Sequence, residues 1–295
     1  MSGSRRALER GAALMAGSAF LFGGMSVAVK LAARTLPNSM VVFFRSAVAL
    51  LLLLPWVLRH GRSALHTERR IEHGVRGLGG VASMYCGFYA IAHMRLADAV
   101  LLNYSLPLLL PLVERAWLKE PIMRRLWVPL GVGFAGLLLI LRPGSSVFQP
   151  VALVGLASAV FAAVAQVGIR GMASTEPVTR IVFYFAMIAT GVSSVPLAFT
   201  WRTPTPPAWL ALLAAGVFAT GAQFLLTRAY ACAPAQQVGP FMYLTVVFSG
   251  LFDWLLWRVV PDGLFLAGAL LVVSAAILTL RLRSVRPRSQ ETSAG

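Results

Sequence analysis

The chain has 295 residues, of which 58% are hydrophobic and only 12% are charged, about half the charged fraction of soluble domains. This composition excludes an ordinary water-soluble domain and indicates an integral membrane protein. The net charge of +16 does not indicate nucleic-acid binding, because the basic residues flank apolar runs and do not gather on one polar domain. The cysteines, Cys86 and Cys232, suggest neither a disulfide framework nor a metal site.

The first apolar run follows a basic N-terminus and resembles a signal peptide. It covers residues 11–33 and carries Lys30 where a small-residue cleavage site would be sought, so it is predicted to be a first membrane span. Apolar windows bounded by charge, Pro or Gly predict nine further spans. They lie near residues 38–58, 74–94, 97–118, 126–142, 150–170, 178–200, 207–229, 236–257 and 263–282. The connections are too short to hold a soluble domain.

Charge predicts how the chain lies in the membrane. Lys and Arg are concentrated in the N-terminal tail and in every second connection, including Arg69-Arg70 and Arg124-Arg125, whereas the other connections hold single basic residues such as Arg95. Cytoplasmic loops of membrane proteins carry the excess of positive charge. Both termini are therefore expected in the cytoplasm of a bacterial inner-membrane protein, which requires an even number of spans. Ten spans fit.

The two halves of the chain show a faint internal repeat with an offset of about 140 residues. The matched pairs include Lys30 and Arg170, Pro37 and Pro177, Tyr104 and Tyr243, and Glu114 and Asp253. Residues 11–142 and 150–282 are thus expected to be two five-span repeats, followed by a disordered cytoplasmic tail at 283–295. A unit with an odd number of spans enters the membrane with opposite polarity in its second copy. The sequence predicts an all-α bundle of two inverted repeats, with a chance match of apolar strings as the alternative.

Three stretches resemble EamA-type members of the drug/metabolite transporter superfamily. They are FFRSAVALLLLLPWVL in the second span, YSLPLLLPLVERAWLKEP in the fourth and MYLTVVFSGLFDWLLW in the ninth. The resemblance covers about residues 11–282 and implies a ten-helix bundle with a central cavity and inverted repeats. Within the superfamily the chain looks most like a branch of S-adenosylmethionine uptake transporters. One departure is Trp257-Arg258-Val259-Val260, where the family usually has Gly-Glu before Pro-Asp.

Polar side chains near the expected midplane are the candidates for binding a solute. They are Tyr85, Tyr89, Asn103, Tyr104, Gln166, Gln223 and Tyr243. Amide and phenol groups suit a zwitterionic or mixed polar and aromatic solute, although each could equally bond a neighbouring helix. Arg45, about two turns inside the second span, is either a cavity cation for an anionic group or a side chain that reaches toward the headgroups. The second repeat has Phe185 at the matched position, so one repeat alone carries this charge.

Charged residues near the span ends predict two gates. Lys30 and Asp253 are expected to close the outer side, and Arg170 and Glu114 the inner side, alternately. The alternative is that headgroups and water satisfy all four. Proton coupling needs an acid that both sides can reach; Glu114 is the first candidate and Asp98 the second, although Asp98 is better placed to cap the fourth span.

These features favour a secondary transporter of a small polar metabolite, such as an amino acid, S-adenosylmethionine or a related solute, that works by alternating access. The chain has no Gly-x-x-x-x-Gly-Lys-Ser/Thr loop, which leaves an ATP-driven pump unsupported. Its four histidines form no HExxH motif, and an integral membrane enzyme, a channel and a scaffold remain as alternatives. Neither a cofactor nor a metal is expected. The lipid bilayer is the expected surrounding, while a coupling proton, a counter-substrate and a homodimer are left open.

Overall fold

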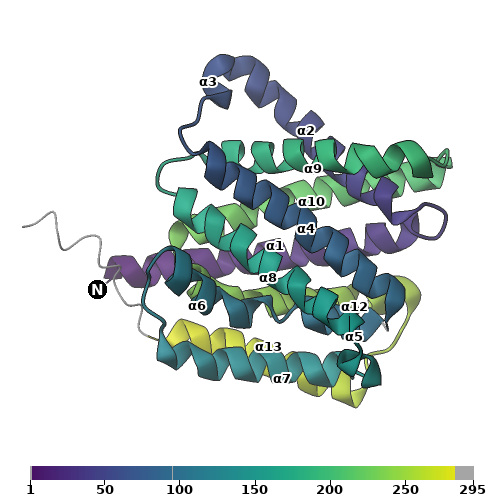
Figure 1. The fold of residues 1–295 in the computed structure, drawn as a ribbon. Coiled ribbons are helices and arrows are strands. Elements are labelled where there is room, and N and C mark those ends of the chain that lie inside the picture. Colours follow the sequence, from purple (N-terminus) through teal and green to yellow (C-terminus); the bar gives the residue numbers. More distant parts are fainter. Residues whose placement is uncertain (1, 95, 283–295) are drawn as a thin grey trace, which may run out of the picture.

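The computed structural model describes residues 2–94 and 96–282, and in these ranges every regular element is a helix (Figure 1). The longer helices are α1 (Ser2–Ala32), α2 (Asn38–His60), α4 (Arg70–His93), α7 (Trp127–Leu141), α8 (Val151–Met172), α9 (Val178–Thr200), α10 (Pro206–Cys232), α12 (Leu244–Trp257) and α13 (Gly263–Arg281). The shorter ones are α3 (Arg62–Leu65), α5 (Leu96–Asn103), α6 (Leu106–Trp117), η1 (Arg124–Leu126), η2 (Ser145–Phe148), α11 (Ala235–Val238) and η3 (Gly239–Tyr243). The predicted tail at 283–295 lies outside the described residues.

Within the described residues, nine helical stretches are long and apolar enough to cross a membrane. The tenth expected span corresponds to α4, which packs along α8 and α9 in the same bundle. Its first two turns carry Arg70, Glu72 and Arg76, so it is less apolar than the others. Nine of the ten expected spans are therefore found among the described residues as helices that could cross a membrane, and α4, the most polar of the ten, lies in the bundle at the place of the remaining one.

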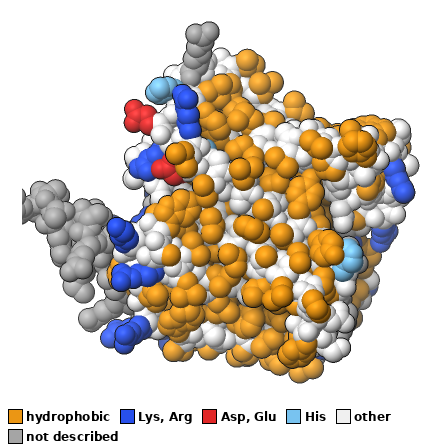
Figure 2. Space-filling model, viewed as in Figure 1, with side chains coloured by type: hydrophobic (Ala, Val, Ile, Leu, Met, Phe, Trp, Pro, Cys, Tyr) orange, Lys and Arg blue, Asp and Glu red, His pale blue; other side chains and the backbone are white. Residues whose placement is uncertain are grey.

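The bundle has two faces, which its helix ends define. The N-terminal face carries the starts of α1 and α4 and the turn between α8 and α9, and it lies to the left in Figure 1. The distal face carries the ends of α1 and α4. Between the two faces the surface is mostly hydrophobic, with Lys and Arg side chains toward the ends (Figure 2). A surface of this kind suits contact with the acyl chains of a bilayer.

The contacts between helices follow a pseudo-two-fold relation. Helix α1 packs along α10, and its repeat mate α8 packs along α4, the mate of α10. The pairs α2 with α9 and α7 with α13 each join a helix to its own mate. The turns also match: Pro37 and Pro177 precede α2 and α9 with nearly the same backbone angles, φ −68° and −66°, ψ 151° and 142°. The fold is a membrane bundle of two inverted five-helix repeats.

Two spans that the sequence predicts as continuous are broken at matched positions. The fourth span changes from α5 to α6 at Tyr104 and Ser105, and the ninth runs through the 3-10 turn η3 up to Tyr243. Pro107 and Pro240 follow or lie in these breaks, and proline has no N–H for the helical ladder. Non-helical backbone at membrane depth is tolerated where protein buries it or where it lines a cavity.

The half of the bundle toward the N-terminal face is filled by a hydrophobic cluster, which we call the N-side cluster. Its largest members are Leu110, Ile169, Met172, Tyr230 and Phe241, none of them more than 4% exposed. They come from α6, α8, α10 and η3. The cluster therefore closes the middle of the bundle on this side.

Candidate functional site

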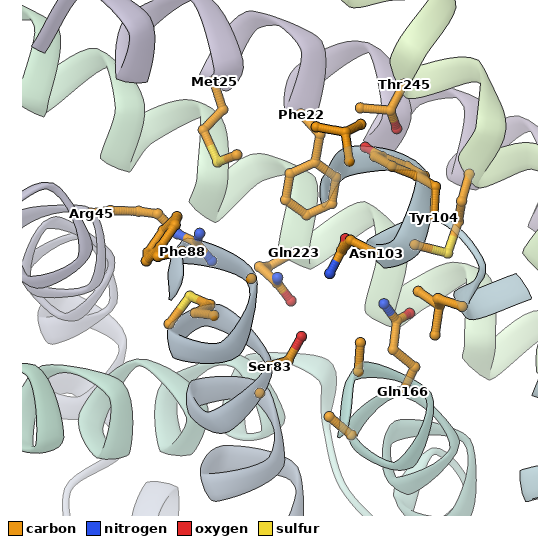
Figure 3. A pocket seen from close by; sticks show the side chains of 18 of the residues that line it. Phe22, Met25, Arg45, Ser83, Phe88, Asn103, Tyr104, Gln166, Gln223 and Thr245 are labelled. Carbon is orange, nitrogen blue, oxygen red and sulfur yellow. The ribbon is translucent and has the colours of Figure 1, made fainter. Parts of the chain in front are cut away.

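A cavity of about 270 Å³ lies between the two repeats. On α4 it extends from Arg76 to Ile91, which is two residues before the helix ends at His93. Its polar lining consists of Arg45, Arg76, Ser83, Asn103, Tyr104, Gln166, Gln223 and Thr245, and most of these side chains point toward one space in Figure 3. Leu106 belongs both to the cavity lining and to the N-side cluster, so the cluster borders the cavity.

Both repeats contribute matched positions to the cavity wall. The matched lining pairs are Phe22 and Ala162, Met25 and Ala165, Arg45 and Phe185, and Met84 and Gln223. Two residues that a two-fold rotation axis relates to each other lie close together only when both are near that axis. The cavity therefore lies on the pseudo-two-fold axis of the inverted repeats, where transporters of this architecture bind their solutes.

Arg76 lies at the end of the cavity nearest the N-terminal face. It is 5% exposed, and its Nη2 donates to Oε1 of Gln223 at 2.8 Å. Its guanidinium lies 4.0 Å from the ring centroid of Phe185. Gly80 makes room for this arrangement, because a Cβ there would fall 2.7 Å from Nη1 of Arg76 and 2.6 Å from the Phe185 ring. The guanidinium is thus held between an amide and an aromatic face.

Arg45 comes from α2 and reaches the same cavity, close to Phe88 (Figure 3). It is half-buried and has neither a hydrogen bond nor an ion pair with any described residue. None of the described carboxylates lines the cavity. The wall therefore carries two positive charges and no compensating negative one.

The opposite wall carries neutral polar groups. Nδ2 of Asn103 donates to Oγ of Ser158 at 3.0 Å, and the Tyr104 phenol points toward Thr245 (Figure 3). Oε1 of Gln166 is buried and has no hydrogen-bond partner among the described residues. These groups offer both donors and acceptors to a solute.

Three of the predicted binding residues lie elsewhere, and these placements correct the sequence-based expectation. Tyr243 is completely buried beside Gly133, where an added Cβ would fall 2.5 Å from its ring. Tyr85 packs with the cluster around Phe185, and Tyr89 is 50% exposed and stacks on His93. Tyr85 and Tyr89 share a helix face as expected, but the residues that line the cavity lie on another face of α4.

The predicted gate residues adopt two different arrangements. Nζ of Lys30 pairs with Oδ1 of Asp253 at 2.8 Å at the distal end of α1 and α12, with both side chains partly exposed. The matched Glu114 is fully buried and does not pair with Arg170. Its carboxylate instead accepts from the backbone N–H groups of Ala235, at 2.5 Å, and Gln236, at 3.1 Å.

Arg170 has other partners than expected, and Asp98 contacts a neighbouring connection. Nε of Arg170 lies 3.7 Å from Oε1 of Glu120, and its Nη1 donates to the carbonyl of Tyr230. Oδ1 of Asp98 accepts from the N–H of Gly144 at 2.7 Å, so this acid fixes the connection after α7. Glu114 and Asp98 both lie outside the cavity lining.

Sequence reasoning missed Arg76, Ser83 and Thr245. Arg76 lies at the start of the predicted span 74–94, and an arginine in that position is usually interfacial. The helix starts at Arg70, which places Arg76 in its second turn. The available signal was Gly80, one helical turn after Arg76, since a glycine there leaves space for the long arginine side chain inside the bundle.

A multi-pass membrane bundle with a solute-sized cavity between inverted repeats is the architecture of a transporter. The family model for the EamA-like transporter family matches residues 9–142 and 149–281, and the chain belongs to this family. A solved crystal structure superimposes with a TM-score of 0.80 at 21% identity, over 91% of this chain and 96% of its own, which supports the fold.

Several named relatives are transporters of small metabolites. The pseudopaline exporter of Pseudomonas aeruginosa is 39% identical, over 94% of this chain and 98% of the relative. The S-adenosylmethionine uptake transporter of Rickettsia bellii is 29% identical over 81% of this chain and 82% of the relative. The riboflavin transporter of Vibrio cholerae is 28% identical over 83% of each. The chain is thus a multi-pass membrane transporter of small metabolites.

Proposed function

We propose that the protein is a secondary transporter that carries a small polar metabolite across the bacterial inner membrane by alternating access. The observation that carries this proposal is the cavity on the pseudo-two-fold axis, which reaches Ile91 near the distal face and ends at the N-side cluster. A solute in this conformation can exchange with one side only.

The inverted repeats supply the second conformation. If residues 11–142 adopt the conformation of residues 150–282 and the reverse, the cavity opens to the N-terminal face. The contact Arg170–Glu120 near the N-terminal face is proposed to break when that face opens. Lys30–Asp253 at the distal face is paired in the present conformation, so this pair does not by itself close the distal side. In the predicted orientation both termini are cytoplasmic, so the conformation described here faces outward.

The geometry favours a carrier over the alternatives. A channel needs a continuous pore, whereas the N-side cluster fills the bundle beyond Arg76. A scaffold has no use for a polar cavity lined by both repeats. For an enzyme, no group of three His, Cys, Asp or Glu side chains gathers as a metal site within the described residues, and the cavity lining holds no carboxylate, histidine or cysteine.

Counterflow in proteoliposomes tests the proposal. Purified protein is reconstituted, and uptake of labelled amino acids, S-adenosylmethionine, riboflavin and organic carboxylates is measured with and without unlabelled solute inside. A carrier gives saturable uptake that internal solute accelerates. Flux that grows linearly with concentration and ignores internal solute would indicate a channel, and no flux of any solute would favour a scaffold.

Proton coupling through Glu114 stays a separate proposal. Its carboxylate is buried against the backbone of α11, away from the cavity lining, so a proton would have to act through the packing of the ninth span. Transport by Glu114→Gln is measured between about pH 5 and 8. A pH profile identical to that of the unsubstituted protein removes this role.

A further inference from the structure

We propose that the cavity is an anion site and that the solute bears at least one carboxylate, which Arg76 and Arg45 bind. The claim that this anion is the transported solute rests on the proposed function. The claim that the site binds a carboxylate rests on the geometry alone.

The first step is the uncompensated charge. An arginine at the centre of a membrane span costs about 2.5–3.5 kcal/mol on insertion scales, and such residues normally pair inside the bundle. Arg45 has no partner among the described residues, and Arg76 has a neutral amide and an aromatic ring. A bound anion supplies the missing negative charge.

The second step is the preorganised guanidinium of Arg76. A guanidinium has five N–H donors. Among described acceptors only Oε1 of Gln223 receives one, and Nε is buried with no partner. Phe185 fixes the plane of the group, and Gly80 leaves the space that it occupies. A planar fork with free donors, held in one orientation, fits a carboxylate, which it can bind through two parallel hydrogen bonds.

The third step is the position of Arg45. It lines the cavity from α2, so that two cations from separate helices face one space of about 270 Å³. Its repeat mate is Phe185, the ring that stacks on Arg76. The first repeat therefore supplies both charges, and the second repeat supplies the aromatic face and the amide that orient one of them.

The rest of the solute is expected to meet neutral groups. Gln166, Asn103 and Tyr104 line the other wall, and Oε1 of Gln166 has no described partner. An amino or hydroxyl group on the solute could donate to that oxygen. A solute with a fixed sulfonium cation, as in S-adenosylmethionine, would meet two arginines and no carboxylate, so an organic acid is favoured over it.

The charge of the site can be measured without knowing the solute. The substitution Ser83→Cys places a reporter thiol in the cavity lining, in a background with Cys86→Ala and Cys232→Ala. The reporter thiol is modified with 2-sulfonatoethyl methanethiosulfonate, an anion, and with the 2-trimethylammonioethyl reagent, a cation. The anionic reagent is expected to react faster relative to its rate on a free thiol.

The arginines are then removed one at a time. At an effective dielectric of 20, a unit charge about 8 Å away changes the energy of a reagent enough to alter the rate ratio by about 10-fold or more. Arg45→Gln and Arg76→Gln should each lower the anion-to-cation rate ratio by that order. Arg76→Lys keeps the charge and should restore it. Arg228→Gln, an exposed arginine outside the cavity lining, is the matched control and should leave the ratio unchanged.

Protection of the reporter thiol tests binding itself. Succinate, glutamate and citrate are offered at millimolar concentration, with succinamide as the uncharged counterpart of succinate. At least one carboxylate should slow labelling several-fold, succinamide should not, and Arg76→Gln should abolish protection while eluting as a folded monodisperse protein. An unchanged rate ratio in both Gln variants, or no protection by any of the three acids, overturns the proposal. Protection without counterflow would keep the site and reject the transport function.

Discussion

The two repeats have one framework and different chemistry at matched places. Arg45 of the first repeat corresponds to Phe185 of the second, and both line the cavity. The first repeat contributes both arginines and Tyr104, whereas the second contributes Gln166, Gln223 and Thr245. The pseudo-symmetry therefore determines which positions line the cavity. The residue types at these matched positions determine that the charge comes from the first repeat.

Tyr104 and Tyr243 occupy matched positions, but a different neighbouring residue places each ring in a different environment. Tyr243 packs over Gly133 of α7, where only a hydrogen leaves room for its ring. The position of α13 that would face Tyr104 in the same way is Val272, whose side chain fills that space. The Tyr104 ring lies in the cavity instead. The repeat predicted equal roles for these residues, and a glycine opposite one of them makes the roles unequal.

The matched acids Glu114 and Asp253 differ most, because Glu114 is buried whereas Asp253 is partly exposed. We therefore expect Glu114→Ala to have the largest effect on stability. It removes the acceptor of two buried backbone N–H groups, and each such loss costs about 1–3 kcal/mol. We expect a loss of about 4 kcal/mol in the free energy of unfolding, measured by reversible unfolding in mixed detergent and SDS micelles.

Glu120→Ala is the control for that measurement. Its side chain is partly exposed and its distance to Arg170 is long, so a change of at most about 1 kcal/mol is expected. Equal losses of unfolding free energy in the two variants would show that the hydrogen bonds from the first residues of α11 to Glu114 do not contribute more than an exposed ion pair.

The substitution Gly133→Val tests why Tyr243 is buried whereas Tyr104 lines the cavity. Its side chain would overlap the Tyr243 ring, and overpacking of this kind costs about 1–3 kcal/mol. We expect about 3 kcal/mol of destabilisation by the same unfolding assay. The control is Gly131→Val on the same helix, because a Cβ there meets nothing within 4 Å. Comparable destabilisation at both positions would refute the packing argument.

The turns before α2 and α9 differ at two matched positions, Arg34 and Ser174, and Leu36 and Glu176. The substitution Glu176→Gln tests the consequence of the second difference. Leu36 is buried in the first turn, whereas Glu176 in the second accepts hydrogen bonds from Thr67 and Arg180. Burial acts to raise the pKa of Glu176, but these hydrogen bonds and the charge of Arg180 outweigh it and hold the pKa below its ordinary value. We expect Glu176→Gln to cost about 1–2 kcal/mol at neutral pH.

The sign of the pH dependence follows from the lowered pKa. The stabilisation is complete above the ordinary glutamate pKa of about 4.3 and is lost as the pH falls through the lower folded value. The difference between unsubstituted protein and Glu176→Gln should therefore shrink on acidification below about pH 4. Glu72→Gln, whose carboxylate is more exposed, is the control and should change stability less. A difference that is constant with pH would contradict the assignment.

Asp253→Asn should have the smallest effect. The Lys30–Asp253 pair is partly exposed, and such pairs contribute about 0–1 kcal/mol. Unfolding should change by less than that amount. The population of the outward-facing form, measured by labelling of the thiol that Ser83→Cys introduces, should change by less than about 5-fold. A complete loss of transport with unchanged stability would contradict this expectation and would indicate that the Lys30–Asp253 pair is an essential gate.

The general architecture could be predicted from sequence because it rests on period, length and charge. Ten apolar windows and a five-span repeat with matched Pro, Tyr and acidic residues predict the bundle. Which residues line the cavity depends on how each helix is rotated about its own axis. The sequence of an apolar span hardly determines this rotation, because the lipid-facing and protein-facing sides of the span are equally apolar. Tyr85, Tyr89 and Tyr243 were therefore misplaced, and Arg76 was not among the predicted binding residues.

The contact between α7 and α13 has a mechanical consequence. A Cβ on Gly136 would fall 2.6 Å from the carbonyl oxygen of Gly268, and one on Gly268 would fall 2.5 Å from that of Gly136, so the two backbones touch. The pseudo-two-fold maps this pair of helices onto itself, whereas it exchanges α1–α10 with α8–α4. If the repeats swap conformations, this pair, like α2–α9, can keep its geometry while α1–α10 and α8–α4 exchange theirs. The close contact at the two glycines would then be a fixed point about which α1, α4, α8 and α10 move.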